Sequence, residues 1–359
     1  MDHMEIGWRR LAAQYIEGKK FQAAEDVVKW MGAMQGQNYP QALWAIGQRM
    51  ESGMLAAVEQ SLIEGKIIRT WPMRGTLHFI APEDSKWLLS LTASRILASS
   101  KGRLKQLELD DKILQRSAEI FRASLSGGKR LSRPAMLKLL EASGIPTHSQ
   151  RGYHILWHWS QCGLLCLGPV EGTQQTFVLL EEWAPHAKEL AREEALLELA
   201  KRYFNSHGPA TVHDFAWWSG LTMKEARAGL ELAKPFLASQ KQLEAEYWFS
   251  EEASFFSLPR EPAIQLLPAF DEYLLGYKDR SSVLPMEYSG KVAPGKNGVF
   301  FPIIVENGQV VGTWKRELSR NSIVLEFDLF SPEYDLPPSW NQAALAFSSF
   351  LEMPIIDGQ

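Results

Sequence analysis

A short polar segment near the start of the chain, residues 34–40 (Met-Gln-Gly-Gln-Asn-Tyr-Pro), holds two glutamines separated by a single residue. Gly36 and Pro40 disfavour a helix here, and the residue before a proline is restricted to extended geometry. Positions i and i+2 of an extended chain point to the same side, so we expect the amides of Gln35 and Gln37 to converge. Such amides can hold a water molecule through a donor and an acceptor. The alternative is a polar turn whose amides cap the neighbouring helices.

Two further clusters carry titratable groups. Asp271 and Glu272 are adjacent within an aromatic and charged stretch. They could serve as a general acid and base, or they could belong to a loop held by salt bridges. His154, His158 and Cys162 share one helix face, but the first and last lie about 12 Å apart along the axis, too far for one tetrahedral ion. The sequence has no CxxC, HExxH or P-loop pattern, and we expect neither a metal nor a cofactor.

The elements that must position these residues form a weak internal repeat. Three times, the spacing of apolar residues predicts short helices followed by two short strands, the layout of a winged helix. The predicted helices cover residues 22–34, 40–50 and 56–64, then 133–143 and 150–162, then 211–219 and 222–233. The predicted strands cover residues 66–71 and 76–80, then 164–167 and 176–180 around a polar loop at 169–175, then 236–238 and 247–249.

Local signals mark several of these boundaries. Ser132 and Thr222 are expected helix N-caps, and Gly144 follows the end of its helix. In the last part of the chain, Asn307-Gly308 predicts a tight hairpin, because both residues tolerate a positive φ. Strand-like stretches there cover residues 263–268, 299–305, 310–314 and 323–330, and a final helix is expected at 339–351.

These elements predict a mainly helical α+β fold with three tandem winged helix-turn-helix units and a small β-rich C-terminal part. The expected domains are a first winged helix at 1–82, a helical linker at 83–128, a second and a third winged helix at 129–185 and 186–262, and a β-rich region with a closing helix at 263–359.

Charge is distributed unevenly along the chain. The net charge is −4, yet residues 1–155 hold 22 Lys and Arg against 15 Asp and Glu, and residues 156–359 hold 16 against 27. A basic first part suits a polyanion, because Lys and Arg release counterions from phosphates; chance segregation of solvated charges is the alternative. There are two cysteines, no signal-peptide pattern at the start and no apolar run near the roughly 20 residues of a membrane span, so we expect a cytoplasmic protein.

Four stretches together resemble the winged-helix crosslink-repair DNA glycosylases of the AlkZ type. They are residues 34–40, 73–78 (Met-Arg-Gly-Thr-Leu-His), 270–280 (Phe-Asp-Glu-Tyr-Leu-Leu-Gly-Tyr-Lys-Asp-Arg) and 311–314 (Val-Gly-Thr-Trp). The resemblance extends from about residue 5 to residue 355. It implies that Gln35 and Gln37 place a water at the sugar C1′ of an alkylated nucleotide. Between them this chain carries Gly36, which is smaller than the residue in many family members.

The resemblance further implies a monofunctional glycosylase that acts as a monomer on double-stranded DNA in the nucleoid and hydrolyses the N-glycosidic bond of purines alkylated at N7 or N3. Crosslinks, one natural-product adduct and simple methylpurines all stay open as substrates. Two alternatives are a winged-helix regulator that binds DNA without catalysis, and a scaffold that has lost its affinity for DNA. The expected DNA contacts are Arg69, Arg74, His78, Lys101, Arg103, Arg130, Arg133, Arg151 and Lys315.

Overall fold

Several helices in this chain begin where a polar side chain caps them. In the computed structural model, Ser132 accepts a hydrogen bond from the Ala135 N–H, and Thr211 and Thr222 each form a reciprocal capping box with the acidic residue three positions later. The predicted caps Ser132 and Thr222 are thus confirmed. The structure describes residues 1–242, 245–251, 263–295 and 298–356. Within these ranges, no helix has both the length and the apolar character needed to cross a membrane.

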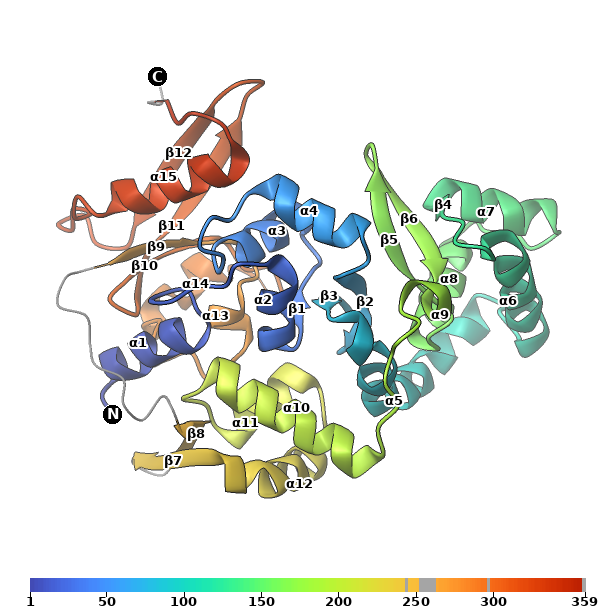
Figure 1. Cartoon of the computed structure of the whole chain (residues 1–359), viewed down its shortest axis with the longest axis horizontal. Helices are drawn as coiled ribbons and strands as arrows, with labels where there is room; N and C mark the ends of the chain where they lie inside the picture. The colour runs from blue at the N-terminus through green and yellow to red at the C-terminus, as the bar shows by residue number, and fades with distance from the viewer. Residues whose placement is uncertain (243–244, 252–262, 296–297, 357–359) are drawn as a thin grey trace. The chain divides into compact units, whose positions relative to one another are not determined.

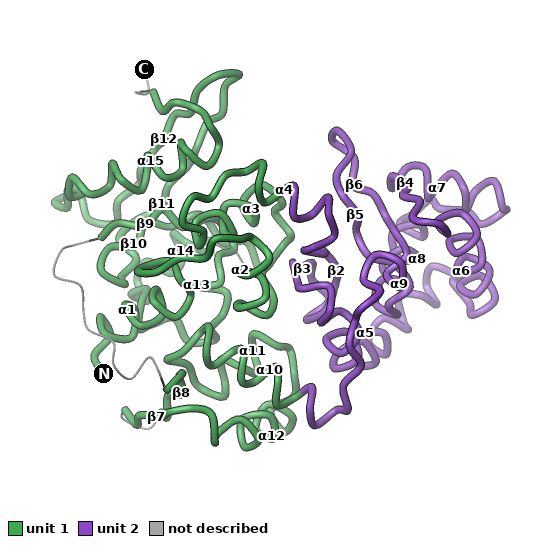
Figure 2. The backbone as a smooth tube through the Cα atoms, in the orientation of Figure 1, with its two compact units in different colours: residues 1–58, 196–359 green, residues 59–195 purple. Residues whose placement is uncertain are grey.

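The fold is mixed α+β, with helices and small antiparallel sheets, which confirms the predicted class (Figure 1). The chain divides into two compact units (Figure 2). Unit 1 consists of residues 1–58 and 196–359, and unit 2 consists of residues 59–195. Unit 1 is therefore assembled from two stretches of chain, and unit 2 is inserted between them in the sequence. Helix α4 (Leu55–Ile63) spans the first boundary.

Unit 2 carries five strands in the order β3-β2-β5-β6-β4, and each pairs antiparallel with its neighbours. The strands are β2 (Ile68–Met73), β3 (Thr76–Ile80), β4 (Leu131–Ser132), β5 (Leu165–Glu171) and β6 (Gln174–Leu179). The helices are a 3₁₀ turn (Pro82–Asp84), α5 (Ser85–Gln106), α6 (Asp111–Leu125), α7 (Arg133–Ala142), α8 (Arg151–Gln161) and α9 (Leu180–Trp183).

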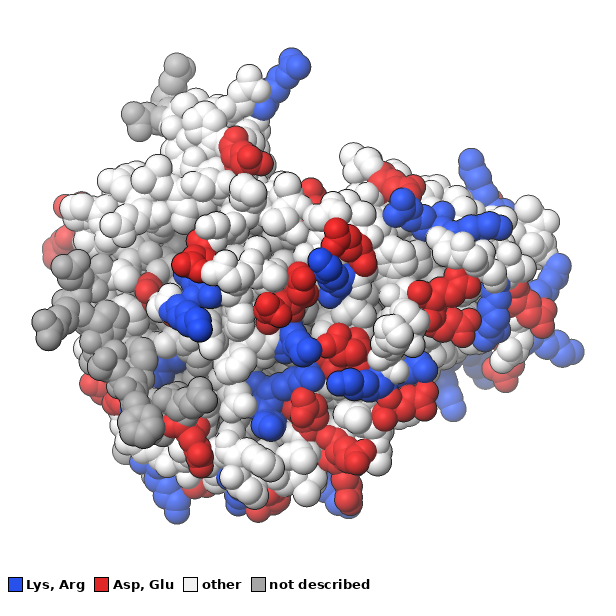
Figure 3. All heavy atoms as spheres, viewed as in Figure 1, with Lys and Arg blue, Asp and Glu red and all other residues white. Residues whose placement is uncertain are grey.

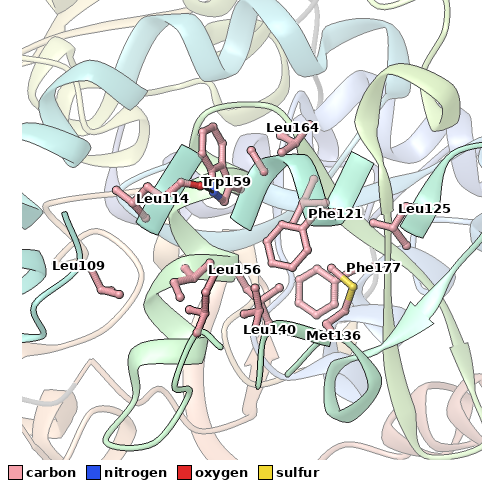
Figure 4. Packing of buried hydrophobic residues seen from close by; sticks show 14 of the residues in the cluster. Leu109, Leu114, Phe121, Leu125, Met136, Leu140, Leu156, Trp159, Leu164 and Phe177 are labelled. Atoms are coloured by element: carbon pink, nitrogen blue, oxygen red, sulfur yellow. Dashed lines mark hydrogen bonds between the residues drawn. The ribbon is translucent and has the colours of Figure 1, made fainter. Parts of the chain in front are cut away.

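The core of unit 2 lies where α6, α7 and α8 bury their apolar faces against β5 and β6 (Figure 4). Phe121, Leu156 and Phe177, from three of these elements, are all less than 5% exposed. The indole N–H of Trp159 also finds partners inside the core, since it donates to Ser117 Oγ at 2.8 Å and to the Leu114 carbonyl at 3.2 Å. This packing fixes one face of α8 and leaves Tyr153, on another face, exposed.

Unit 1 contains most of the remaining elements. Its helices are α1 (His3–Ala13), α2 (Ala24–Met31), α3 (Tyr39–Gly47), α10 (Arg192–His207), which starts at the end of unit 2, α11 (Val212–Ser219), α12 (Met223–Ala233), α13 (Glu272–Leu275), α14 (Ser289–Val292), α15 (Trp340–Leu351) and 3₁₀ turns at Lys234–Phe236 and Met286–Tyr288. Its strands are β1 (Met34–Gln35), β7 (Leu237–Gln242), β8 (Ala245–Ser250), β9 (Ile264–Leu267), β10 (Ile303–Glu306), β11 (Gln309–Leu318) and β12 (Ile323–Leu329).

The predicted strands and the closing helix of the last part of the chain are present. The strands form an antiparallel sheet in the order β12-β11-β10-β9. Asn307 and Gly308, with φ of 50° and 77°, form the predicted hairpin turn between β10 and β11. Helix α15 packs through Phe347, whose ring centroid lies 5.1 Å from that of Trp44 and 5.2 Å from that of Trp314. Aromatic contacts therefore join the end of the chain to α3 near its beginning.

Among the predicted boundaries that differ from the structure, two are set by a glycine. The helix expected at 22–34 covers only Ala24–Met31, because Gly32 adopts a φ of 75° and the chain then becomes extended. The polar loop expected at 169–175 is largely strand, because the ladder continues through Val170 opposite Gln175 and narrows to a tight turn at Gly172. In both places a single left-handed glycine determines where the element ends.

Each of the three expected winged-helix segments contains short helices followed by a hairpin. The segments hold α2, α3, α4 with β2 and β3, then α7 and α8 with β5 and β6, then α11 and α12 with β7 and β8. The first segment continues across the boundary between the two compact units. The part of the third segment at 252–262, and the last residues of the β-rich region at 357–359, lie outside the described residues.

Candidate active site

The local sequence makes the segment of the two glutamines non-helical, as predicted. Gly32 ends α2, Met34–Gln35 is an extended strand, and α3 starts at Tyr39 with a proline in its first turn. Gln35 is half-buried and Gln37 is exposed. The Gln37 side chain makes no hydrogen bond within the described part of the chain, so it does not act as the helix cap of the alternative interpretation. Its amide is available to a ligand.

A buried carboxylate holds the backbone of this segment. The N–H of Gln35 donates to Oε1 of Glu272 at 2.8 Å, and the indole N–H of Trp218 donates to Oε2 of the same carboxylate at 3.0 Å. Glu272 is 1% exposed, and it is the first residue of α13, after the N-cap Asp271. Removing a carboxylate from water is expensive unless its oxygens accept hydrogen bonds. These two donors compensate that cost, and they link α13 and α11 to β1.

A buried histidine faces the same carboxylate. His207 Nε2 lies 3.6 Å from Glu272 Oε2, and His207 Nδ1 lies 2.8 Å from Ser206 Oγ. The imidazole stacks on the ring of Tyr203, with a centroid separation of 4.8 Å and an interplanar angle of 17°. Burial lowers the pKa of His207, and the neighbouring Glu272 carboxylate opposes that shift. The imidazole is therefore neutral near pH 7.

The second carboxylate of the pair, Asp271, is a structural group. Its two oxygens lie 2.9 Å from Nη1 and Nη2 of Arg49, and both side chains are almost fully buried. Arg49 also donates to Gln14 Oε1 at 2.8 Å and to the Ala45 carbonyl at 2.7 Å. The salt-bridge interpretation is confirmed for Asp271. The idea of an accessible acid/base pair is wrong, because neither Asp271 nor Glu272 reaches the surface.

The sequence could not predict that Gln35, Trp218 and His207 lie beside Glu272. Glu272 appeared in the sequence only as half of a carboxylate pair, and His207 and Trp218 were not singled out. Gln35 and Trp218 lie 237 and 54 residues from Glu272 along the chain. Sequence spacing carries no signal over such distances, because only the tertiary fold brings these groups together.

Three of the predicted DNA contacts are buried. His78 is fully buried and bonds the Thr76 carbonyl through Nδ1 at 2.9 Å. Arg151 is 8% exposed, and its guanidinium donates to the backbone carbonyls of Leu107, Glu108 and Pro146. Arg69 is 9% exposed. Because the guanidinium of Arg151 joins two loops of unit 2, and the imidazole of His78 lies inside the unit, both are structural residues in this fold.

The other predicted contacts are accessible. Lys101, Arg103, Arg130, Arg133 and Lys315 are exposed, and Arg74 is half-buried. Arg130 pairs with Glu171 at 2.7 Å, so only part of its charge is available to phosphates. On the face that Figure 3 shows, Lys and Arg are interspersed with Asp and Glu rather than collected into one patch. Arg69 and Arg133 line one pocket of unit 2.

The shared helix face of His154, His158 and Cys162 does not form a metal site. Cys162 Sγ lies 3.6 Å from His158 Nε2, which is one contact between two residues. Across the described ranges, no group of three His, Cys, Asp or Glu side chains is close enough to hold a metal ion. Burial lowers the pKa of His158 and raises the pKa of the Cys162 thiol, which favours the neutral form of each.

A family model described as "DNA glycosylase AlkZ-like" matches residues 28–346, and the chain belongs to this AlkZ-like family. The interstrand DNA cross-link repair glycosylase of Streptomyces sahachiroi is 26% identical over 341 residues, which cover 87% of this chain and 88% of that protein. The solved structure of the Streptomyces sahachiroi DNA glycosylase AlkZ superposes with a TM-score of 0.82 over 100% of both chains, at 23% identity. The predicted family resemblance is confirmed, and the two structures share a fold.

Proposed function

We propose that this protein is a monofunctional DNA glycosylase that hydrolyses the N-glycosidic bond of purines alkylated at N7 or N3, including those in interstrand crosslinks. The observation that carries the proposal is the anchoring of the Gln35 backbone on Glu272, next to an exposed Gln37 side chain without a partner in the described chain. The buried Glu272 carboxylate fixes the backbone of the segment, and the Gln37 side chain is exposed. In this function the two amides orient the attacking water.

The chemistry suits neutral amides. A purine alkylated at N7 or N3 is cationic and leaves without being protonated, so the site needs no strong acid. The sugar develops oxocarbenium character as the bond breaks. An amide can hold water through its donor and its acceptor beside that positive centre without repelling it. Because an amide is not a general base, the rate enhancement comes mostly from orientation.

The carboxylates support the same substrate class. Asp271 is engaged by Arg49, and Glu272 accepts from Gln35 and Trp218 inside the protein. Neither group is placed to protonate a departing neutral base. A lesion that already carries a positive charge on its base is therefore the matching substrate, and unmodified purines are expected to stay intact.

We further propose that three winged-helix units bind the DNA as parts of one monomer, in the cytoplasm among the chromosomal DNA. The phosphate contacts in this proposal come from the accessible cations, which are Arg74, Lys101, Arg103, Arg130, Arg133 and Lys315. Arg151 and His78 are not among these contacts, because their side chains are buried inside unit 2. Phosphate contacts make binding fall steeply as salt rises.

Base release from duplexes that carry N7-methylguanine or an N7-linked crosslink tests the proposal. Gln37→Ala is expected to slow release by at least about 100-fold, and Gln35→Ala by a similar factor, with DNA affinity nearly unchanged. Asn38→Ala is the matched control, because Asn38 is exposed in the same segment and its side chain makes no capping hydrogen bond to α3. Release by Gln37→Ala at the rate of Asn38→Ala would remove the catalytic assignment. Sequence-specific footprints without any release would favour a regulator.

A further inference from the structure

Unit 2 has a pocket of about 230 Å³ whose walls are aromatic and whose charges are all positive. The pocket is lined by Trp71, Tyr153, Trp157, Phe177, Arg69 and Arg133, together with Leu77, Leu156, Leu167 and Gln175. Among these described lining residues, none is acidic. Drug-sized ligands usually occupy pockets of roughly 300–1,000 Å³, so this one suits a single small ring system.

One of the two cations is held firmly in the pocket wall. Arg69, from β2, donates through Nη1 to Oε1 of Gln175 at 2.9 Å, and its guanidinium carbon lies 5.9 Å from the centre of the Phe79 ring. The amide of Gln175 is itself fixed, because its Nε2 donates to the carbonyls of Gly168 and Thr176. A guanidinium in a fixed orientation loses little freedom when it binds an anion.

The second cation stands at an accessible part of the pocket. Arg133 is exposed at the start of α7, and its guanidinium carbon lies 5.7 Å from the centre of the Tyr153 ring. Tyr153 is 38% exposed, and Trp157 is half-buried four residues further along α8. Side chains four residues apart lie on one helix face, so the two rings are neighbours in the same wall. The pocket thus offers aromatic surface beside an exposed positive charge.

Aromatic walls and two arginines favour a ligand that has a planar ring and a negatively charged group. Bases stack on aromatic side chains regardless of sequence, and Arg binds phosphate oxygens in pairs. A base that is paired and stacked in a duplex cannot enter a pocket of this kind, whereas an unpaired base can swing out of the stack. In a chain of the AlkZ-like DNA glycosylase family, the ligand with this chemistry is one unpaired nucleotide of a DNA strand.

We propose that the pocket formed by Arg69, Arg133 and the rings of α8, β2 and β6 binds a single unpaired nucleotide, with its base on the aromatic wall and its phosphate at Arg133. The pocket belongs to unit 2, whereas Gln35 and Gln37 belong to unit 1. Its lining contains neither glutamine, so in this proposal it is a second nucleotide site and not the site of bond cleavage. The proposal rests on the proposed function only in taking DNA as the ligand.

Fluorescence anisotropy on the full-length protein tests it with two duplexes of the same sequence, one fully paired and one with a single unpaired adenine. The wild-type protein is expected to bind the second duplex about tenfold more tightly. Arg133→Ala and Tyr153→Ala should each reduce that preference to about twofold or less. Lys138→Ala is the matched control, because Lys138 is another exposed cation of α7 that does not line the pocket. It should weaken binding to both duplexes equally.

Two outcomes overturn the proposal: equal affinity of the wild-type protein for the two duplexes, or an identical preference in Arg133→Ala and Lys138→Ala. The result is independent of catalysis, because Gln37→Ala should lose base release and keep the full preference for the unpaired adenine. Conversely, loss of the preference in Tyr153→Ala should leave the rate of N7-methylguanine release at saturating enzyme unchanged, because Tyr153 lines the pocket and is not one of the proposed phosphate contacts. Failure of this site and failure of the proposed activity are thus separate observations.

Discussion

The backbone N–H of Gln35 donates to Oε1 of Glu272 across 2.8 Å, although 237 residues separate the two along the chain. The other oxygen of that carboxylate accepts from the Trp218 indole at 3.0 Å and faces His207 at 3.6 Å. The segment with the two glutamines is therefore attached to a buried charged group from the C-terminal part of the chain. Its position depends on Glu272, which accepts hydrogen bonds through both side-chain oxygens.

Glu272→Gln is expected to displace the glutamine segment without emptying the site. The new amide keeps one acceptor oxygen for Gln35, but it turns an NH₂ group toward the Trp218 indole, so that two donors face each other. We expect the single-turnover rate constant for base release to fall about 10- to 100-fold. The enzyme concentration for half-maximal rate should change by less than about twofold, because Glu272 does not reach the surface.

The double variant Trp218→Phe/Glu272→Gln provides the control, because phenylalanine removes the opposing donor. Its rate constant should recover toward that of Trp218→Phe alone. If Glu272→Gln lowers only the melting temperature, and releases base at the wild-type rate well below that temperature, Glu272 stabilises the fold without positioning Gln35.

Breaking the buried ion pair of Arg49 and Asp271 should strongly destabilise the protein. Both side chains are buried, with two contacts of 2.9 Å, and removal of one partner leaves an uncompensated charge. Arg49→Met is expected to lower the free energy of unfolding by about 3–5 kcal/mol in urea titrations. The double variant Arg49→Met/Asp271→Asn should recover most of the loss, since Asn retains the oxygen that caps Tyr273 N–H. Equal stability of the single and double variants would argue against this explanation.

Two glycines allow close contact between the N-terminal helix and the β10–β11 hairpin. A Cβ atom on Gly7 would lie 2.3 Å from the carbonyl oxygen of Gly308, which is backbone that cannot turn aside. Gly7→Ala should therefore destabilise the protein by about 2 kcal/mol or more. Gly102→Ala is the control, because Gly102 lies inside α5 with open space around it, and alanine there should stabilise the helix by about 0.5–1 kcal/mol. Thermal unfolding of both variants measures the contrast.

Stability should decline on mild acidification because of His207. Burial lowers its pKa in the folded protein below the ordinary value of 6.5, and Glu272 only partly opposes this. The unfolded chain therefore takes up a proton first, and the contribution of His207 is complete above pH 6.5 and is lost as the pH falls below it. The urea midpoint should drop between pH 7.5 and pH 5.5. In His207→Gln the drop should be smaller, and an unchanged drop would assign the effect to other groups.

The sequence predicts the fold of this chain where local chemistry decides the structure. Ser132 and Thr222 cap helices because a hydroxyl can satisfy a free backbone N–H, and Asn307-Gly308 turns because both residues accept a positive φ. The segment between Gly32 and Tyr39 is non-helical for similarly local reasons. These features depend on a few consecutive residues, so the local sequence is enough to predict them.

Local sequence patterns do not predict the structure where it depends on burial or on contacts between residues far apart in the chain. Arg151 and His78 have side-chain types that suit phosphate contacts, yet the fold places both inside unit 2. Glu272 was visible as a carboxylate, but its partners Gln35 and Trp218 are remote in sequence. Whether a polar group faces water or the interior depends on the packing of whole elements, which local patterns do not encode.

The insertion of unit 2 within unit 1 has a consequence for synthesis on the ribosome. Gln35 is translated long before Glu272, and at about 5–20 residues per second the interval of 237 residues lasts roughly 12 to 47 s. Unit 2 is continuous in sequence and is complete by residue 195, well before that interval ends. Residues 1–58 therefore lack their packing partners from residues 196–359 while unit 2 is synthesised and folds, and their apolar side chains stay exposed during that time. Chaperone dependence during translation should accordingly concentrate on residues 1–58.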